Sequence, residues 1–182
     1  MRFSIFLALV CGLSACNSNS NSANRATDDP ALLTTADFEQ SIGWGDADPN
    51  SLTTEKAHSG HWSVRVKPDV PFGYTYARNL SEISKTPLTR LVLDAWVLRT
   101  AAGSTAKLVV QVNASPTDDT KVFYTAFPVE QTVTKFGEWT AVSVPISLPT
   151  SAAGANRMKV YLWNDQSTAP TYLDDMTLRK AQ

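Results

Sequence analysis

Short runs in which apolar and polar residues alternate fill the chain from Leu32 onward. In the run RMKVYLW, from Arg157 to Trp163, the apolar side chains of Met158, Val160 and Leu162 occupy every second position. A period of two places these side chains on one face of a strand and the polar or aromatic ones on the other. Strands of this kind form antiparallel sheets that are covered on one side only. We therefore expect two antiparallel sheets that pack face to face.

Comparable runs recur along the chain and are separated by Pro, Gly, Asn, Asp and Ser. Their spacing of roughly 8–20 residues is typical of an all-β sandwich. No window has the pattern of an amphipathic helix, so the predicted fold is an all-β, antiparallel β-sandwich. The expected strands are 34–39, 62–67, 73–78, 90–98, 107–114, 121–127, 139–146, 158–163 and 172–178.

The aliphatic face of each strand predicts the core, because a period of two sorts core from surface. We also assign three tryptophans to the core and expect Ser63, Arg65 and Lys67 to face solvent. The predicted core residues are Trp44, Trp62, Val64, Val66, Leu91, Leu93, Ala95, Val97, Leu108, Val110, Val112, Trp139, Val142, Val144 and Ile146.

The opposite faces of several strands combine aromatic rings with short polar groups. Sugar rings stack their C–H patches on aromatic rings, and their hydroxyls need fixed donors and acceptors. We predict one shallow, open cleft that binds a neutral oligosaccharide, with Arg78 as the charge that would favour an acidic sugar. The alternative for each aromatic is a small secondary core under a loop. The candidate sugar-binding residues are Tyr74, Tyr76, Arg78, Asp94, Trp96, Gln111, Asn113, Tyr161 and Trp163.

Length and charge narrow the function classes. The chain has 182 residues, which suits one domain, and its formal net charge of −1 gives no reason to expect a nucleic-acid partner. Residues 1–15 have Arg2 and then a short apolar run, which predicts a signal peptide. The tetrad Leu13-Ser14-Ala15-Cys16 resembles the lipobox of bacterial lipoproteins. This resemblance implies cleavage before Cys16, its lipidation, and a lipid-anchored place in the bacterial cell envelope, at the outer membrane or cell surface.

Residues 16–32 are polar and predict a flexible tether that follows the lipidated cysteine. An ordinary secretory signal is the alternative to the lipoprotein signal. Cys11 and Cys16 are the two cysteines of the sequence, so a domain spanning 33–182 contains no thiol. Disulfides, cysteine metal sites and cysteine nucleophiles are therefore excluded from it.

Several short motifs resemble those of carbohydrate-binding modules of the galactose-binding-like jelly-roll type, in the grouping of families 4, 9 and 22. The resemblance implies a jelly-roll domain over residues 33–182, a glycan partner, and carbohydrate-active enzymes as further candidate partners. The motifs are Asp37-Phe38-Glu39, Gly43-Trp44, His58-Ser59-Gly60, LVLDAWVLR from Leu91, Gly137-Glu138-Trp139 and the closing run from Tyr172 to Leu178.

The same resemblance implies a structural calcium ion that joins the first strand, a turn and the closing strand. By position, it implicates Glu39, main-chain oxygens near Gly60, and Asp174, with Asp175 as an alternate. The alternative is that Asp174 accepts backbone N–H groups or pairs with a basic residue. The acidic stretch 46–50 begins like a helix–loop–helix calcium loop, but Ser51 and Ala57 stand where that motif needs Gly and Glu.

Catalysis is the less favoured reading of the sequence. A glycosidase needs two opposed carboxylates, and Asp94, Glu130, Glu138 and Asp165 cannot be paired from sequence. His58 and His61 lie in one turn without a third ligand nearby, which favours turn histidines over a metal pair. We predict a non-catalytic glycan-binding lipoprotein. The alternatives are a ligand-free structural or protein-interaction domain and, less favoured, a small jelly-roll polysaccharide-degrading enzyme.

Overall fold

The computed structural model describes residues 29–40 and 49–181. The predicted signal peptide, Cys16, most of the tether, Trp44 and the greater part of the acidic stretch at 46–50 lie outside these residues. Over the described ranges, no helix is long and apolar enough to cross a membrane.

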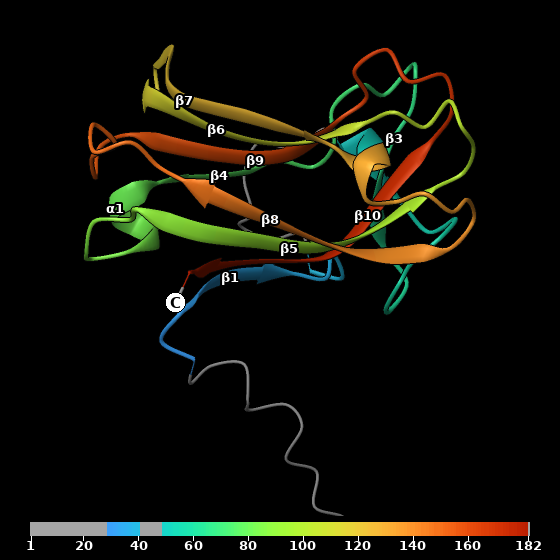
Figure 1. The fold of residues 1–182 in the computed structure, drawn as a ribbon, viewed down its shortest axis with the longest axis horizontal. Coiled ribbons are helices and arrows are strands. Elements are labelled where there is room, and N and C mark those ends of the chain that lie inside the picture. The colour runs from blue at the N-terminus through green and yellow to red at the C-terminus, as the bar shows by residue number, and fades with distance from the viewer. Residues whose placement is uncertain (1–28, 41–48, 182) are drawn as a thin grey trace, which may run out of the picture.

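One layer of the molecule is a six-stranded sheet with the order β2-β3-β10-β5-β8, in which β1 also pairs with β10. Strand β10 pairs with β3 through its first residues and with β1 through its last residues, so both short strands lie along it. Figure 1 shows this layer below the second one. Its strands are β1 (Leu32–Ala36), β2 (Leu52–Thr53), β3 (Ser63–Val66), β5 (Arg90–Arg99), β8 (Trp139–Ser147) and β10 (Thr171–Lys180).

The other layer is a four-stranded sheet with the order β4-β9-β6-β7. All the strand pairs of both sheets are antiparallel, and the chain passes from one sheet to the other after β3, β4, β5, β7, β8 and β9. The predicted jelly-roll sandwich is therefore confirmed. The strands are β4 (Tyr76–Asn79), β6 (Lys107–Ser115), β7 (Asp118–Pro128) and β9 (Arg157–Trp163), and the short helices are η1 (Pro49–Ser51), α1 (Leu80–Ile83) and η2 (Val129–Gln131).

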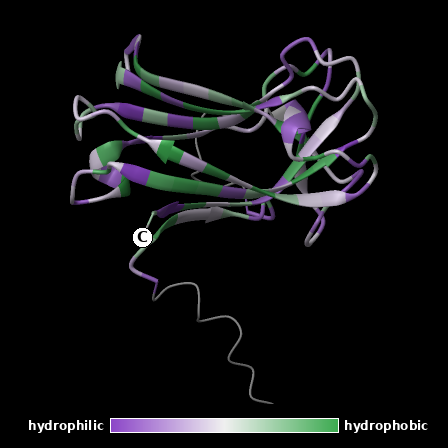
Figure 2. Cartoon of the chain, viewed as in Figure 1, coloured by the Kyte–Doolittle hydropathy of each residue, from purple (hydrophilic) through white to green (hydrophobic). Residues whose placement is uncertain are grey.

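The core lies between the sheets and consists mainly of the aliphatic rows that the alternation predicts. Leu93, Val110 and Leu162 are all less than 2 % exposed and come from three different strands. Figure 2 shows the alternation of hydrophobic and hydrophilic positions along the long strands. At roughly 25 cal/mol per Å² of buried apolar surface, these rows supply the main free energy that holds the sheets together.

Three assignments at the core boundary are wrong. Trp62 precedes β3 in a turn and is 41 % exposed, so it does not share the buried face of Val64. Trp139 is half-buried on the outer side of the six-stranded sheet, where its ring lies edge-on to His58. Ser63, expected in solvent, is fully buried where β2 pairs with β3, and its hydroxyl donates to the Lys56 carbonyl.

Candidate functional site

The predicted sugar-binding residues divide between the two outer faces of the sandwich. Gln111 lies on β6 and Tyr161 on β9, in the four-stranded sheet, whereas Trp96 lies on β5 in the six-stranded sheet. Asn113 and Trp163 accompany the first group, and Asp94 accompanies Trp96. The prediction of one common face is therefore wrong. Alternation separates outward from inward positions, but it does not say which sheet a strand joins.

Tyr74 and Tyr76 do not belong to either outer face. They are 6 % and 5 % exposed and form part of the core cluster, which corrects their assignment as sugar platforms. Burial raises the pKa of Tyr76 to about 12. Arg78 is half-buried and pairs in register with the inward-facing Met158. It lines a hollow beside β1 with Glu82 and Arg157, and so also lies away from the predicted cleft.

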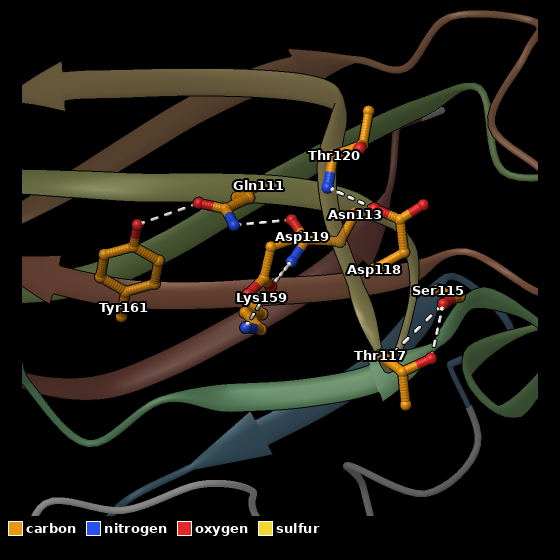
Figure 3. A network of polar contacts seen from close by, with 9 residues as sticks. All are labelled: Gln111, Asn113, Ser115, Thr117, Asp118, Asp119, Thr120, Lys159 and Tyr161. Atoms are coloured by element: carbon orange, nitrogen blue, oxygen red, sulfur yellow. Dashed lines mark hydrogen bonds and ion pairs between the residues drawn. The ribbon is translucent and has the colours of Figure 1, made fainter.

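A chain of hydrogen bonds runs across the outer face of the four-stranded sheet (Figure 3). The Tyr161 hydroxyl donates to Gln111 Oε1 over 3.2 Å, and Gln111 Nε2 donates to Asn113 Oδ1 over 2.6 Å. Asn113 Nδ2 then donates to Asp119 Oδ1 over 2.5 Å, and Lys159 Nζ lies 3.4 Å from the same oxygen. Both amides are nearly or completely buried, so their orientations are fixed before any ligand arrives.

Tyr161 is a proton donor in this chain at every physiological pH. Burial, with a smaller contribution from the neighbouring Tyr124 hydroxyl, raises the pKa of its hydroxyl to about 12. The ring itself remains partly exposed. A protonated phenol that is held by Gln111 presents its ring in one orientation.

Exposed aromatic rings flank the hydrogen-bond chain. Phe72 is 50 % exposed and packs edge-on against Tyr161, with the ring centroids 6.1 Å apart. Tyr124 on β7 is 41 % exposed and stands directly across from Gln111. A hollow of about 200 Å³ is lined by Phe72, Thr75, Gln111, Lys159 and Tyr161. We call the set Phe72, Gln111, Asn113, Tyr124, Lys159 and Tyr161 the aromatic–amide face.

Phe72 and Tyr124 are members that the sequence reasoning missed. Tyr124 lies in an expected strand and shares its parity with Ala126. The register shift between Val112 and Asn113 interrupts this alternation before Lys121, so the strand has no continuous outward pattern. Phe72 precedes β4 in a segment without regular alternation and forms an isolated bridge with Trp163. No sequence pattern placed Phe72 beside Tyr161.

Trp163 lies at the margin of the aromatic–amide face and is half-buried. Lys107 Nζ lies 5.6 Å from the centre of its ring and forms an ion pair with Asp165. A cation over an indole face is attracted by the ring quadrupole. Part of the Trp163 ring is therefore already covered. The ring of Tyr124 likewise has Lys121 Nζ 4.7 Å from its centre, so Phe72 is the most open platform of the three.

On the other outer face, Trp96 is stacked on His58, with ring centroids 3.9 Å apart and planes at 13°. Asp94 lies beside it and is held by the Arg179 side chain and the Ser143 hydroxyl, each at 2.6 Å. Trp96 and Trp163 are thus on opposite sides of the sandwich and do not pack together under one loop.

The four residues implicated in calcium binding gather around one turn, His58–Trp62. Glu39 Oε1 accepts the backbone N–H groups of His61 and Trp62, both at 2.6 Å. A Cβ atom on Gly60 would lie 2.4 Å from the same oxygen, and the residue has a φ of +56°, so the turn requires glycine. Those N–H bonds hold the pKa of Glu39 below its ordinary value.

Asp174 is fully buried beside the same turn. Its Oδ2 accepts the N–H groups of His58 and Ser59 at 2.7 and 3.2 Å, and its Oδ1 accepts that of Asp175 at 2.8 Å. Burial raises the pKa of this carboxyl, and the N–H donors oppose that rise. These contacts correspond to the alternative in which backbone N–H groups satisfy Asp174.

The donor chemistry of this turn suits calcium, because Glu39, Asp174 and Asp175 bring hard carboxylate oxygens from two distant segments. Within residues 29–40 and 49–181, however, no three acidic, histidine or cysteine side chains converge on one point. His58 contacts Asp175 and His61 lies near Glu39, so the two histidines serve different carboxylates. Main-chain oxygens would have to complete the ligand set, and the calcium site stays a prediction.

The fold is that of a jelly-roll carbohydrate-binding module. Among solved structures, the chain resembles the C-terminal family 22 carbohydrate-binding module of Clostridium thermocellum xylanase 10B, at 16 % identity over 83 % of this chain and 94 % of that one, with a TM-score of 0.54. It also resembles a family 22 xylan-binding domain from Paenibacillus barcinonensis, at 17 % identity over 84 % and 97 % of the two chains, with a TM-score of 0.52. No family model and no curated protein matches the sequence.

Proposed function

We propose that this protein binds a glycan through its aromatic–amide face and performs no chemistry on it. The observation that carries the proposal is the pairing of exposed rings, Phe72 and Tyr124, with the fixed hydrogen-bond chain of Tyr161, Gln111 and Asn113. Rings supply stacking surfaces for sugar C–H groups, and the buried amides hold the Tyr161 ring and hydroxyl in a fixed orientation beside them. Such a surface holds a sugar but offers no opposed pair of carboxylates for hydrolysis.

The glycan we propose is a neutral, β-linked pentose or hexose chain. Lys159 lies beside Asp119 and Lys107 pairs with Asp165, so two of the cations of this surface are offset by carboxylates, while Lys121 lies over the Tyr124 ring. Similarly folded modules are described as xylan-binding, and one neighbouring structure contains xylohexaose. Open stacking buries little area, so we expect dissociation constants on the order of micromolar to millimolar.

Phe72→Ala tests this proposal. We expect a loss of binding of about tenfold or more in affinity electrophoresis through soluble xylan, because the exposed ring contributes stacking worth about 1.4 kcal/mol or more. Phe136→Ala is the matched control, since Phe136 is 49 % exposed, as Phe72 is, but lies beside Arg99 instead of Tyr161. Equal retardation of the parent and both variants would contradict the proposal that the aromatic–amide face binds the glycan.

We also propose that the protein is a lipid-anchored component of the bacterial cell envelope, with acyl chains on Cys16 and residues 16–32 as the tether. Two or more acyl chains give stable membrane attachment. Cys16→Ser should abolish incorporation of a labelled fatty acid into the protein in cells, because the thiol is the acyl acceptor. Equal labelling of the variant and the parent would contradict the lipoprotein assignment.

A further inference from the structure

A groove of about 440 Å³ crosses the outer face of the six-stranded sheet, on the side opposite the aromatic–amide face. It runs over β10, β5 and the edge strand β8, and the strand register places Trp96 opposite Ala141 and Asp94 opposite Ser143. Its size is within the range of small-ligand sites. We call it the Trp96 groove and define it by Asp94, Trp96, Ala141, Ser143, Asp175 and Thr177.

The indole of Trp96 forms a rigid wall of this groove. His58 covers one face of the indole at 3.9 Å, which fixes the ring in place. Ala141, its neighbour on β8, is exposed and has a small side chain, so the indole projects beyond it and its edge is left uncovered on that side. A flat apolar surface with an uncovered edge matches the C–H face of a pyranose ring.

Two carboxylates border the indole, and each is oriented by two contacts. Asp94 is held by Arg179 and Ser143 at 2.6 Å each. Asp175 contacts His58 Nδ1 at 2.5 Å and accepts the Ser59 hydroxyl at 2.7 Å. A carboxylate has about four lone-pair sites, so both keep acceptor capacity for further donors.

The backbone is shaped to present Asp175 on this side. Strand β10 has a register shift between Asp174 and Thr177, and Asp175 has a φ of +46°. Bulges of this kind re-aim a side chain out of the regular alternation. Asp174, in register with Trp96, is buried beneath the turn at His58 and Ser59, while Asp175 lines the groove. Arg179 offsets the charge of Asp94, and His58 and Ser59 occupy acceptor sites of Asp175, so the groove favours a neutral ligand with hydroxyl donors over a cation.

We propose that the Trp96 groove is a second glycan-binding site, which takes one or two pyranose rings through stacking on Trp96 and hydroxyl contacts to Asp94 and Asp175. The class of ligand, a glycan, rests on the proposed function. The residues of the groove are a separate set on the other face of the sandwich. With sites on both outer faces, one molecule would hold two glycan chains at the same time. Linking two such contacts raises the retention on a polysaccharide above that of either site alone.

Titration of the ¹⁵N-labelled protein with xylohexaose, cellohexaose and mannohexaose, followed by ¹H–¹⁵N NMR, observes the two faces separately. We expect shifts of the Trp96 indole N–H and of the Ser143 amide, and a separate set at Gln111 and Tyr161. Ala141→Tyr should remove the first set by filling the groove and keep the second, which also shows that the variant is folded. Ser147→Tyr, at an exposed position of the same strand outside the groove, should keep both sets.

The outcomes distinguish the two proposals. Shifts confined to Gln111 and Tyr161 would overturn the groove proposal and leave the proposed function standing. Shifts confined to Trp96 and Ser143 would support the groove and reject the aromatic–amide face. If the Trp96 shifts persist unchanged in Ala141→Tyr, they do not come from a ligand in the groove, and the groove proposal is wrong. No shift with any of the three hexasaccharides would reject both sites.

Discussion

At the scale of single residues, burial and hydrogen bonding together decide which side chains a ligand can meet. Tyr76 and Tyr161 are both tyrosines on strands of the four-stranded sheet, and burial raises the pKa of each to about 12. Tyr76 is 5 % exposed and packs in the core, whereas Tyr161 keeps part of its ring at the surface and donates to Gln111. Residue type alone does not separate a core tyrosine from a binding one.

Asp174 is the residue that tests the calcium prediction. If calcium joins Glu39 and Asp174, a chelator should lower the melting temperature and added calcium should restore it, because an ion bound to the native state stabilises that state. Asp174→Asn should remove this response. It should also cost about 1–3 kcal/mol of unfolding free energy, because three N–H groups lose a charged acceptor.

The matched control for that experiment is Asp94→Asn, which removes a carboxylate of the same sheet that is held by Arg179 and Ser143 instead of by the backbone of the turn. This variant should retain the response of the parent to chelator. A parent melting curve that is indifferent to chelator would reject the ion. The three backbone N–H groups would then be sufficient to explain how the buried Asp174 carboxylate is stabilised.

At the scale of elements, the strands were predictable because alternation and turn residues are local signals. The expected strand at 90–98 became β5 (Arg90–Arg99), and that at 158–163 became β9 (Arg157–Trp163). The short α1, of four residues, gave no periodic signal and was missed. Ends also shifted where tertiary pairing decides, as at β4, which begins at Tyr76 instead of residue 73.

Partners that come from distant segments could not be predicted in the same way. Arg99 looks like a surface residue at a strand end, but it is 6 % exposed and donates to the carbonyls of Ser104, Ala102 and Val133. Its contact with Val133 spans 34 residues. Phe72 meets Tyr161 in the same manner. Such contacts depend on how loops close over the sheets, which no local pattern encodes.

At the scale of the whole molecule, two outer faces carry aromatic and polar groups, and the core separates them. Each face keeps its polar groups paired within itself: Asn113 with Asp119 on one side, and Asp94 with Arg179 on the other. This internal pairing fixes the side chains and reduces the conformational entropy that a ligand must remove. A rigid sandwich with prearranged surfaces is suited to recognition, whereas catalysis requires groups placed around a reacting bond.

The central claim is that the protein binds glycan and leaves it intact. Incubation of the purified protein with insoluble xylan, cellulose and mannan, with the bound fraction and the released reducing ends measured in the same samples, tests it most directly. We predict retention on at least one polysaccharide, reversed by soluble oligosaccharide of the same type, with no reducing ends above the protein-free control. Release of reducing ends, or no retention on any of the three, would contradict the account.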